Sequence, residues 1–156
     1  MQLTIDPTSL DANSRLTSIR LAWLILRCME NARSNVGDGD SAMILVAVVA
    51  ISGERLTRGG LDDELRSVST PLPPGVAGEC NVSSIAAATG FNRETTRRKV
   101  NGLIDSGYLQ RTSDGEIALM PGILARDVTQ ALARHQIEAI TRFVNEALRD
   151  GVLTAA

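Results

Sequence analysis

Residues that can recognise nucleic acid are concentrated in one short part of the sequence. From Phe91 to Arg111, five basic residues stand against two acidic ones, a local charge of +3, whereas the whole chain carries -2. Arginine can donate two hydrogen bonds to a guanine edge, and threonine and asparagine can bond to bases or phosphates. The local contrast indicates a DNA-binding patch. The alternative is an ordinary solvated helix face.

The spacing from Asn92 to Ser106 predicts a helix that orients these groups. At about 100° per residue, Thr96, Val100, Leu103 and Ile104 share one face, which must look inward. Thr95 and Arg98 lie roughly opposite, so we expect them to approach bases, while Arg93, Arg97 and Lys99 position phosphates. The full predicted DNA-binding set is Ser83, Ser84, Asn92, Arg93, Thr95, Arg97, Arg98, Lys99, Asn101 and Arg111.

The flanking residues predict the elements that hold this helix. A short helix before it has N-cap candidates at 81–84 and a C-cap at Gly90, and Asn92 caps the basic helix. Gly107 ends that helix. Strands at 108–111 and 116–120, joined by the turn Thr112 to Gly115, predict a hairpin. Helix, turn, basic helix and hairpin is the order of a winged helix-turn-helix.

The run ETTRRKVNGLIDSGYLQR, with SSIAAATGFN before it, resembles bacterial winged helix-turn-helix transcription regulators, the MarR-like and GntR-like families among them. The matching positions are Thr95, Arg97, Arg98, Val100, Leu103, Gly107, Tyr108 and Leu109. The resemblance covers about a quarter of the chain and implies sequence-specific DNA binding. Two features depart from the pattern: Thr96 stands where an apolar residue is usual, and the connector before Val82 is long.

We expect three segments. Residues 1–38 are an N-terminal arm of about ten residues followed by an apolar helix. Residues 39–122 form the winged domain, with a long insertion at 53–79. Residues 123–156 carry a C-terminal dimerisation helix, expected from about Ile123 to Arg149. In the winged domain, the apolar run Ala42 to Ser52 is interpreted as a helix capped by Asp40 or Ser41.

Apolar stripes on both terminal helices leave two interpretations open. Leu16, Ile19, Trp23 and Leu26 recur at helical spacing in the first helix, and Ile137, Ile140, Val144 and Ala147 recur in the last. These stripes either pack on each other within one chain or on the same helices of a second chain. The resemblance implies that both ends interlace in a homodimer.

Several function classes find no support in the sequence. Cys28 and Cys80 lack the spacing of a zinc site. The sequence allows either a disulfide between them or two unpaired thiols without a function. His135 has no nucleophile nearby, and no P-loop, GxSxG or HExxH motif occurs. We therefore expect no enzyme activity, no cofactor and no metal. The N-terminus is polar, and even the longest apolar run is too short to span a membrane. These features predict a soluble, cytoplasmic protein.

Together these observations predict a mainly α fold and a homodimeric transcription regulator that binds double-stranded DNA through residues 92–106. A small-molecule effector is possible, but no residues mark its site. Two alternatives stay open. One is a winged-helix protein-interaction or assembly module without DNA binding, and the other is a replication or partition DNA-binding protein.

Overall fold

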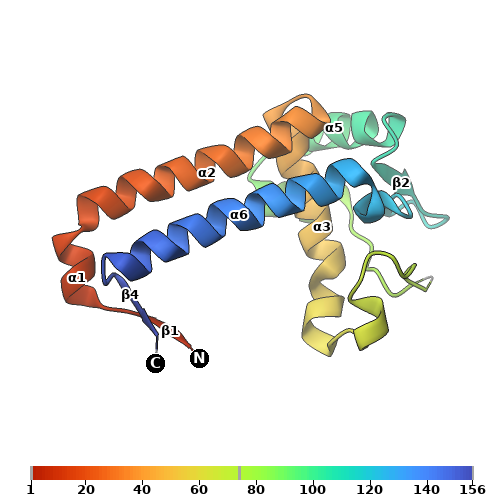
Figure 1. Ribbon diagram of the computed structural model, residues 1–156. Helices are drawn as coiled ribbons and strands as arrows, with labels where there is room; N and C mark the ends of the chain where they lie inside the picture. The colour runs from red at the N-terminus through yellow and green to blue at the C-terminus, as the bar shows by residue number, and fades with distance from the viewer. Residues whose placement is uncertain (1, 74, 156) are drawn as a thin grey trace. The chain divides into compact units, whose positions relative to one another are not determined.

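The computed structural model describes residues 2–73 and 75–155, where the chain is mainly helical (Figure 1). The predicted mainly α class with one small antiparallel hairpin is confirmed. Met1, Pro74 and Ala156, which belong to the predicted arm, insertion and C-terminal segment, lie outside the described residues. The elements are β1 (Leu3–Ile5), α1 (Pro7–Ala12), α2 (Ser14–Val36), α3 (Gly39–Gly59), α4 (Val82–Thr89), α5 (Arg93–Asp105), β2 (Leu109–Arg111), β3 (Ile117–Leu119), α6 (Asp127–Arg149) and β4 (Leu153–Ala155).

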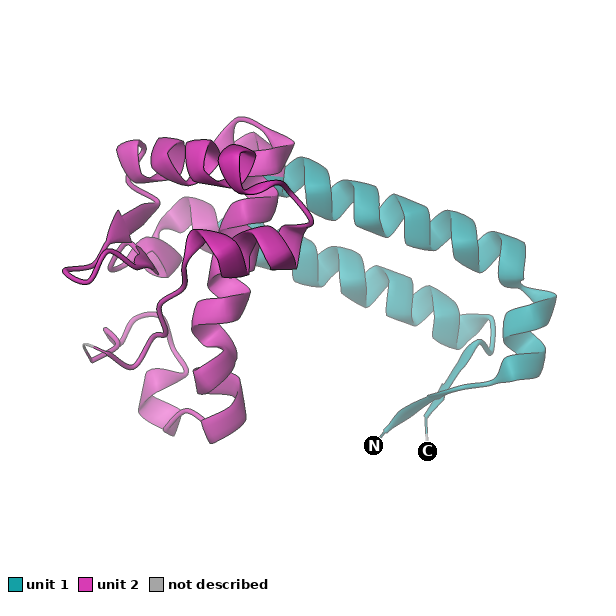
Figure 2. Cartoon of the chain, turned by 180° about the vertical axis from the view of Figure 1, so that it is seen from behind, with its two compact units in different colours: residues 1–32, 131–156 teal, residues 33–130 magenta. Residues whose placement is uncertain are grey.

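The chain divides into two compact units (Figure 2). Unit 1 comprises residues 1–32 and 131–156, and unit 2 comprises residues 33–130. Unit 2 contains the predicted helix-turn-helix stretch, and unit 1 contains most of α2 and α6.

Unit 2 is built around one apolar core between α3, α4, α5 and the hairpin. Ile44 and Val48 of α3, Ile85 of α4, Val100 of α5 and Leu109 of β2 are each fully buried. Burial of large aliphatic side chains is the main favourable term in folding. This core therefore fixes how α5 lies on α3 and α4, and which face of α5 remains outside.

The ends of α4 and α5 follow the predicted caps. Asn81 caps α4, its side chain accepting from the Ser84 N–H at 3.0 Å, and Ser84 Oγ accepts from the Asn81 N–H at 3.1 Å. Gly90 takes the left-handed conformation that closes α4, at φ 76°. Asn92 caps α5 by accepting from the Thr95 N–H at 2.8 Å. These reciprocal bonds satisfy N–H groups that a helix end leaves without partners.

The hairpin forms as predicted, with shorter strands. β2 and β3 pair antiparallel with Leu109 opposite Leu119, and the Gly115 N–H donates to the Thr112 carbonyl at 3.0 Å in the turn. Cys80 also pairs with Ile117 through two backbone hydrogen bonds of 2.9 and 2.7 Å. The residue that precedes α4 is therefore fixed to the hairpin.

Three sequence predictions need correction. Residues 2–10 do not form the loose arm that was predicted, because β1 pairs with β4 and α1 follows, capped by Asp6. The N-cap of α3 is Asp38, not Asp40 or Ser41; its carboxylate accepts from both the N–H and the hydroxyl of Ser41.

The third correction concerns element boundaries. α3 continues to Gly59, so the predicted insertion at 53–79 begins within a helix, and its only other helical turn among the described residues is a 3-10 turn at Asp63–Leu65. The terminal helix starts at Asp127, after a 3-10 turn at Ile123–Ala125.

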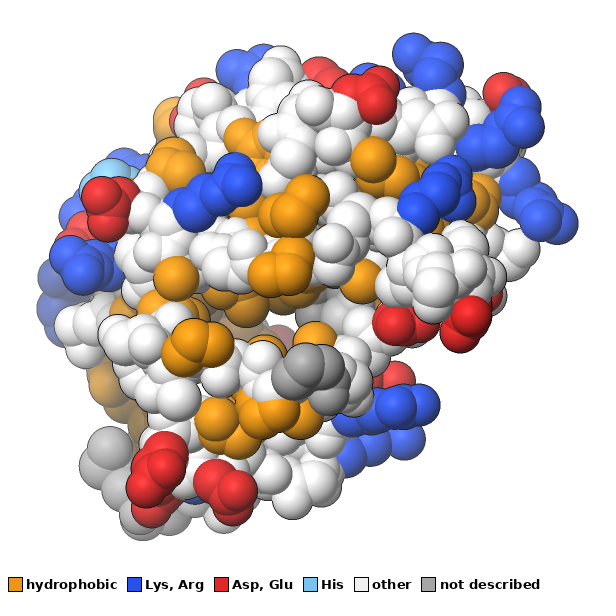
Figure 3. Space-filling model, turned by 90° about the vertical axis from the view of Figure 1, so that its right-hand side faces the viewer, with side chains coloured by type: hydrophobic (Ala, Val, Ile, Leu, Met, Phe, Trp, Pro, Cys, Tyr) orange, Lys and Arg blue, Asp and Glu red, His pale blue; other side chains and the backbone are white. Residues whose placement is uncertain are grey.

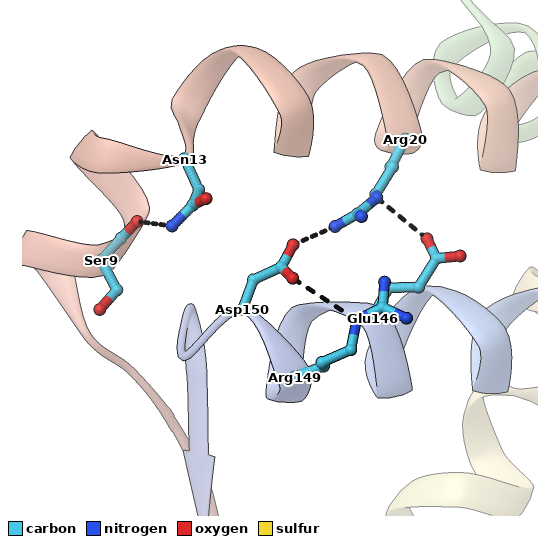
Figure 4. A network of polar contacts seen from close by, with 6 residues as sticks. All are labelled: Ser9, Asn13, Arg20, Glu146, Arg149 and Asp150. Atoms are coloured by element: carbon cyan, nitrogen blue, oxygen red, sulfur yellow. Dashed lines mark hydrogen bonds and ion pairs between the residues drawn. The ribbon is translucent and has the colours of Figure 1, made fainter.

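In unit 1, α2 and α6 lie side by side and are joined by an ion-pair network (Figure 4). The Arg20 guanidinium contacts Asp150 and reaches Glu146 Oε2 at 3.1 Å. This contact holds the pKa of Asp150 below its ordinary value. Near the termini, Asn13 Nδ2 donates to the Ser9 carbonyl at 3.0 Å. Polar contacts thus fasten the end of the helix pair closest to β1 and β4.

Among the described residues, no single helix has both the length and the apolar character needed to cross a membrane. The consecutive helices α2 and α3 meet that test only when taken together, and they are bent by 97° at the junction between them.

Candidate nucleic-acid interface

α5 presents two chemically different faces. Thr96, Val100 and Leu103 are buried, as predicted. Arg93, Arg97 and Arg98 are exposed. The core therefore holds the helix from one side. Arg98 lies roughly opposite that side, whereas Arg93 and Arg97 lie nearer the edge of the core, and all three side chains are exposed. Figure 3 shows one face of the molecule, with Lys and Arg side chains toward its upper right and acidic side chains also present.

Thr96, the residue that departs from the usual apolar pattern, fits the core without an unpaired hydroxyl. Its side chain is fully buried, and Oγ1 donates to the Asn92 carbonyl at 2.9 Å. A buried hydroxyl is costly only when it lacks a partner. The methyl group of Thr96 thus packs in the core while the hydroxyl bonds to the first turn of its own helix.

Arg97 pairs with Glu94 on the exposed surface. Arg97 Nη2 lies 2.8 Å from Glu94 Oε2, and the two side chains are 61% and 74% exposed. Exposed pairs one turn apart contribute only about 0.3–0.5 kcal/mol. Arg97 can therefore leave this partner for a phosphate at little cost.

Lys99 is held differently from the three arginines. Its Nζ lies 2.7 Å from Asp38 Oδ1, and its side chain is only 17% exposed. Hydrogen bonds from Lys99 and Ser41 lower the pKa of Asp38 well below the ordinary carboxyl value. The structure thus places Lys99 in an ion pair with the N-cap of α3, whereas Arg93, Arg97 and Arg98 are more exposed.

Asn101 and Arg111 are brought together by the fold. Arg111 Nη2 donates to Asn101 Oδ1 at 3.0 Å, and Nη1 donates to the Gly115 carbonyl at 3.3 Å. Both residues remain exposed. The guanidinium of β2 is therefore oriented against α5, and its remaining N–H groups are available to a ligand.

The other predicted residues divide between capping and exposed positions. Ser84 and Asn92 are occupied as helix caps, whereas Ser83 is exposed at the start of α4. Thr95 is half-buried in the first turn of α5. The first turn of α5 thus follows the connecting turn directly, and its N–H dipoles favour an anion.

Two groups near this surface were missed from the sequence. Asp38 was missed, although an aspartate three residues before Ser41 has the spacing of a cap. Arg126 was also missed. Its guanidinium lies 6.0 Å from the Tyr108 ring centroid, and Nη2 donates to the Gly107 carbonyl at 3.1 Å. No sequence pattern marks this contact, because the residues belong to separate elements.

The described residues contain neither a cluster of metal-binding side chains nor a disulfide. No group of three or more His, Cys, Asp or Glu side chains within them could hold a metal ion. Cys28 and Cys80 are free thiols. Burial raises the pKa of Cys80 to about 11, so its reactive thiolate form is suppressed at neutral pH.

Comparisons of the chain with protein-family models, with curated proteins and with solved structures found no match.

Proposed function

We propose that the chain is a winged helix-turn-helix protein that binds double-stranded DNA as a transcription regulator, with α5 as its recognition helix. The order α3, α4, α5, β2 and β3 supports this fold assignment, as does the three-residue turn between α4 and α5. The hairpin β2–β3 is then the wing. A protein of this kind acts on DNA by groove insertion, so α5 must have a free face.

One observation carries the proposal. Arg93, Arg97 and Arg98 are exposed on a helix whose apolar face is fixed in the core of unit 2, and Arg98 lies roughly opposite that face. A rigidly held helix with exposed guanidinium groups is suited to enter a major groove, because base readout requires precise placement. In this assignment Arg98 and Thr95 approach base edges, and Arg93 and Arg97 contact phosphates.

The wing has a smaller role. Arg111 of the wing donates a hydrogen bond to Asn101 of α5. In this assignment its guanidinium contacts the DNA backbone. Asp114 at the tip of the hairpin opposes close approach to phosphate. Lys99 contributes positive potential, but its half-buried pairing with Asp38 makes it a weaker phosphate contact than the exposed arginines.

The second candidate function is an assembly module without DNA binding. The net charge of -2 and the exposed apolar side chains of α2 and α6 favour it. A role in replication or partition would use the same DNA-binding surface, so it differs from regulation only in the DNA site that is bound.

The decisive experiment measures affinity for duplex DNA as a function of salt. We expect binding to a mixed-sequence duplex at low salt, weakening linearly on a log–log plot as phosphates exchange counterions. Selection from a random duplex pool should then yield a pseudo-palindrome with half-sites about one helical turn, ~34 Å, apart if two copies bind together. Absence of measurable affinity for any duplex at low salt would remove the proposal and leave the assembly module.

A further inference from the structure

The outward side of α5 carries a carboxylate that is not among the predicted DNA-binding residues. Glu94 precedes Arg98 by four positions, so the two side chains lie about 40° apart around the helix. Arg97 lies about 100° from Arg98, and Arg93 lies about 140° from it, closer to the core. The acid is therefore more central on the outward side than either arginine that is assigned to phosphate.

The position of Glu94 has no explanation within the chain. Its side chain is 74% exposed, so its charge is solvated and contributes little to the fold. The helix dipole favours an acid anywhere in the first turn, so it does not require one on the outward side. On a surface that only neutralises phosphates, a carboxylate here would weaken binding by repulsion.

Arg97 holds this carboxylate without using all the groups of either side chain. Arg97 Nη2 donates to Glu94 Oε1 at 3.0 Å and to Oε2 at 2.8 Å. Because one nitrogen makes both bonds, the Nη1 and Nε groups of Arg97 remain for a phosphate. The carboxylate, which has about four acceptor positions, keeps the capacity to accept from another donor.

Gly102 keeps the same side of α5 free of bulk. It is exposed and follows Arg98 by four positions, so it lies about 40° from Arg98, on the side away from Glu94. A Cβ at this position would meet nothing within 4 Å, so packing within the chain does not require glycine. Glycine within a helix is less favourable than alanine. Close approach of another molecule to this side of α5 accounts for its presence.

The major groove offers a carboxylate one kind of favourable partner. Recognition helices contact base edges through their N-terminal residues, and Glu94 is the second residue of α5. A carboxylate only accepts hydrogen bonds, and cytosine presents its 4-amino donor in this groove. Guanine and thymine present acceptors there, and adenine places its N7 acceptor beside its amino donor. Glu94 is therefore matched to cytosine and repelled by guanine and thymine.

We infer that Glu94 determines sequence specificity by accepting a hydrogen bond from the 4-amino group of a cytosine in the major groove. Arg97 offsets the charge of this carboxylate while it contacts the DNA backbone. This role rests on the proposed function, because it requires α5 to enter a major groove. Glu94 then lowers the affinity for most duplexes and preserves it for those with cytosine at one position.

The first test selects binding sites from a random duplex pool with the unmodified chain and two variants. Glu94→Gln keeps the size of the side chain, but glutamine both donates and accepts, which suits N6 and N7 of adenine. We expect the preferred base at one position to change from cytosine to adenine. Affinity for the original site should fall by about 10- to 100-fold.

Asp105→Asn is the matched control. It removes one negative charge from an exposed position of the same helix, at the end far from Glu94. We expect this variant to select the same site as the unmodified chain, with a general rise in duplex affinity. Equal changes of base preference in the two variants would show that only the charge of α5 matters, and would overturn the role of Glu94.

The second test alters the DNA. Each cytosine of the selected site is replaced in turn by pyrimidin-2-one, which lacks the 4-amino group. At one cytosine, the unmodified chain should lose about 10- to 100-fold more affinity than Glu94→Ala loses on the same replacement. Because both proteins meet the same pair of duplexes, the weaker base pairing of the analogue cancels. Equal losses in both proteins at every cytosine would overturn the role of Glu94.

The results separate this role from DNA binding itself. Specific binding by Glu94→Gln with an unchanged base preference would overturn the specificity role alone and leave α5 as the recognition helix. If the unmodified chain binds no duplex, the proposed function is wrong and the role of Glu94 is wrong with it. We expect unchanged helical circular dichroism in the variants, because both substituted residues are exposed. If Glu94→Gln loses this signal, the comparison with Glu94→Ala on the altered duplexes decides.

Discussion

Lys99 and Asp38 join the candidate recognition helix to the helix beneath it. Lys99 Nζ lies 2.7 Å from Asp38 Oδ1, and the same carboxylate accepts from the Ser41 N–H and hydroxyl at 2.9 and 2.7 Å. One side chain thus caps α3 and anchors α5. The orientation of α5 depends on this polar contact as well as on the apolar core.

Acid should weaken unit 2 through this carboxylate. Because hydrogen bonding lowers the pKa of Asp38 in the folded chain, its contribution is present above the unfolded value near 4 and is lost as pH falls through the folded value. Asn is also a good N-cap, so Asp38→Asn isolates the charge-dependent part. We expect a loss below about 1 kcal/mol at pH 7, since the Asp38 side chain is 45% exposed. Urea unfolding from pH 7 to pH 2 should show the two proteins converging; a constant difference would contradict the assignment.

Replacing Arg98 with Ala should weaken specific DNA binding by roughly 1–3 kcal/mol, because a base contact is lost. Fluorescence anisotropy with a selected site measures the change. Arg55→Ala, which removes an exposed cation from α3, is the matched control and should have a smaller effect. Equal losses in both variants would indicate that only overall charge matters.

Lys99→Met should separate stability from recognition. The substitution keeps much of the aliphatic stem but removes the ammonium that bonds to Asp38. We expect the carboxyl pKa of Asp38 to rise toward its ordinary value, as NMR titration can measure. DNA affinity should fall less than in Arg98→Ala. A larger loss of affinity with an unchanged Asp38 pKa would instead make Lys99 a direct contact.

Thr96→Val should be tolerated despite complete burial. Valine nearly preserves the shape, and the Asn92 carbonyl loses one donor while still accepting the Thr96 N–H bond at 3.0 Å. The free energy of unfolding should change by no more than about 1 kcal/mol. Thr96→Ser, which keeps the hydroxyl and removes the methyl, should be the more destabilising of the two because it leaves a void. Thermal unfolding of both variants gives the comparison, and the reverse order would contradict this account.

Gly78→Ala should destabilise unit 2 by about 1–3 kcal/mol, because the added methyl crowds a packed backbone. Gly78 is buried, and a Cβ there would lie 3.1 Å from the Ser52 carbonyl oxygen. Gly53→Ala on α3 meets nothing within 4 Å, so it should stabilise by up to about 1 kcal/mol through helix propensity. Urea unfolding of both variants measures these opposite signs.

Local signals in the sequence predicted the parts of unit 2 that depend on local chemistry. Asn81, Gly90 and Asn92 mark helix ends because side chains or backbone freedom act within a few residues. The inward face of α5 follows from helical periodicity. Even so, the N-cap of α3 was predicted at Asp40 or Ser41, two or three residues late, because Asp38, Asp40 and Ser41 are all residue types that cap helices.

Contacts between distant residues could not be predicted in this way. The partner of Lys99 is 61 positions away in the sequence, and the pairing of Arg111 with Asn101 depends on how the hairpin folds back on α5. The strand β1 was missed because three residues become a strand here only by pairing with β4. The apolar stripes were visible, but periodicity alone does not identify their partner.

The hydrogen bond between Ser52 and Gly78 has a consequence for the length of the connector. The Gly78 N–H donates to the Ser52 carbonyl at 2.9 Å, so the segment between these two residues begins and ends at one point within unit 2. The segment is therefore a closed loop. The entropic cost of closing a flexible loop grows only with the logarithm of its length, about 0.6 kcal/mol per doubling. The same core can therefore carry a shorter or a longer segment here with little change in its stability.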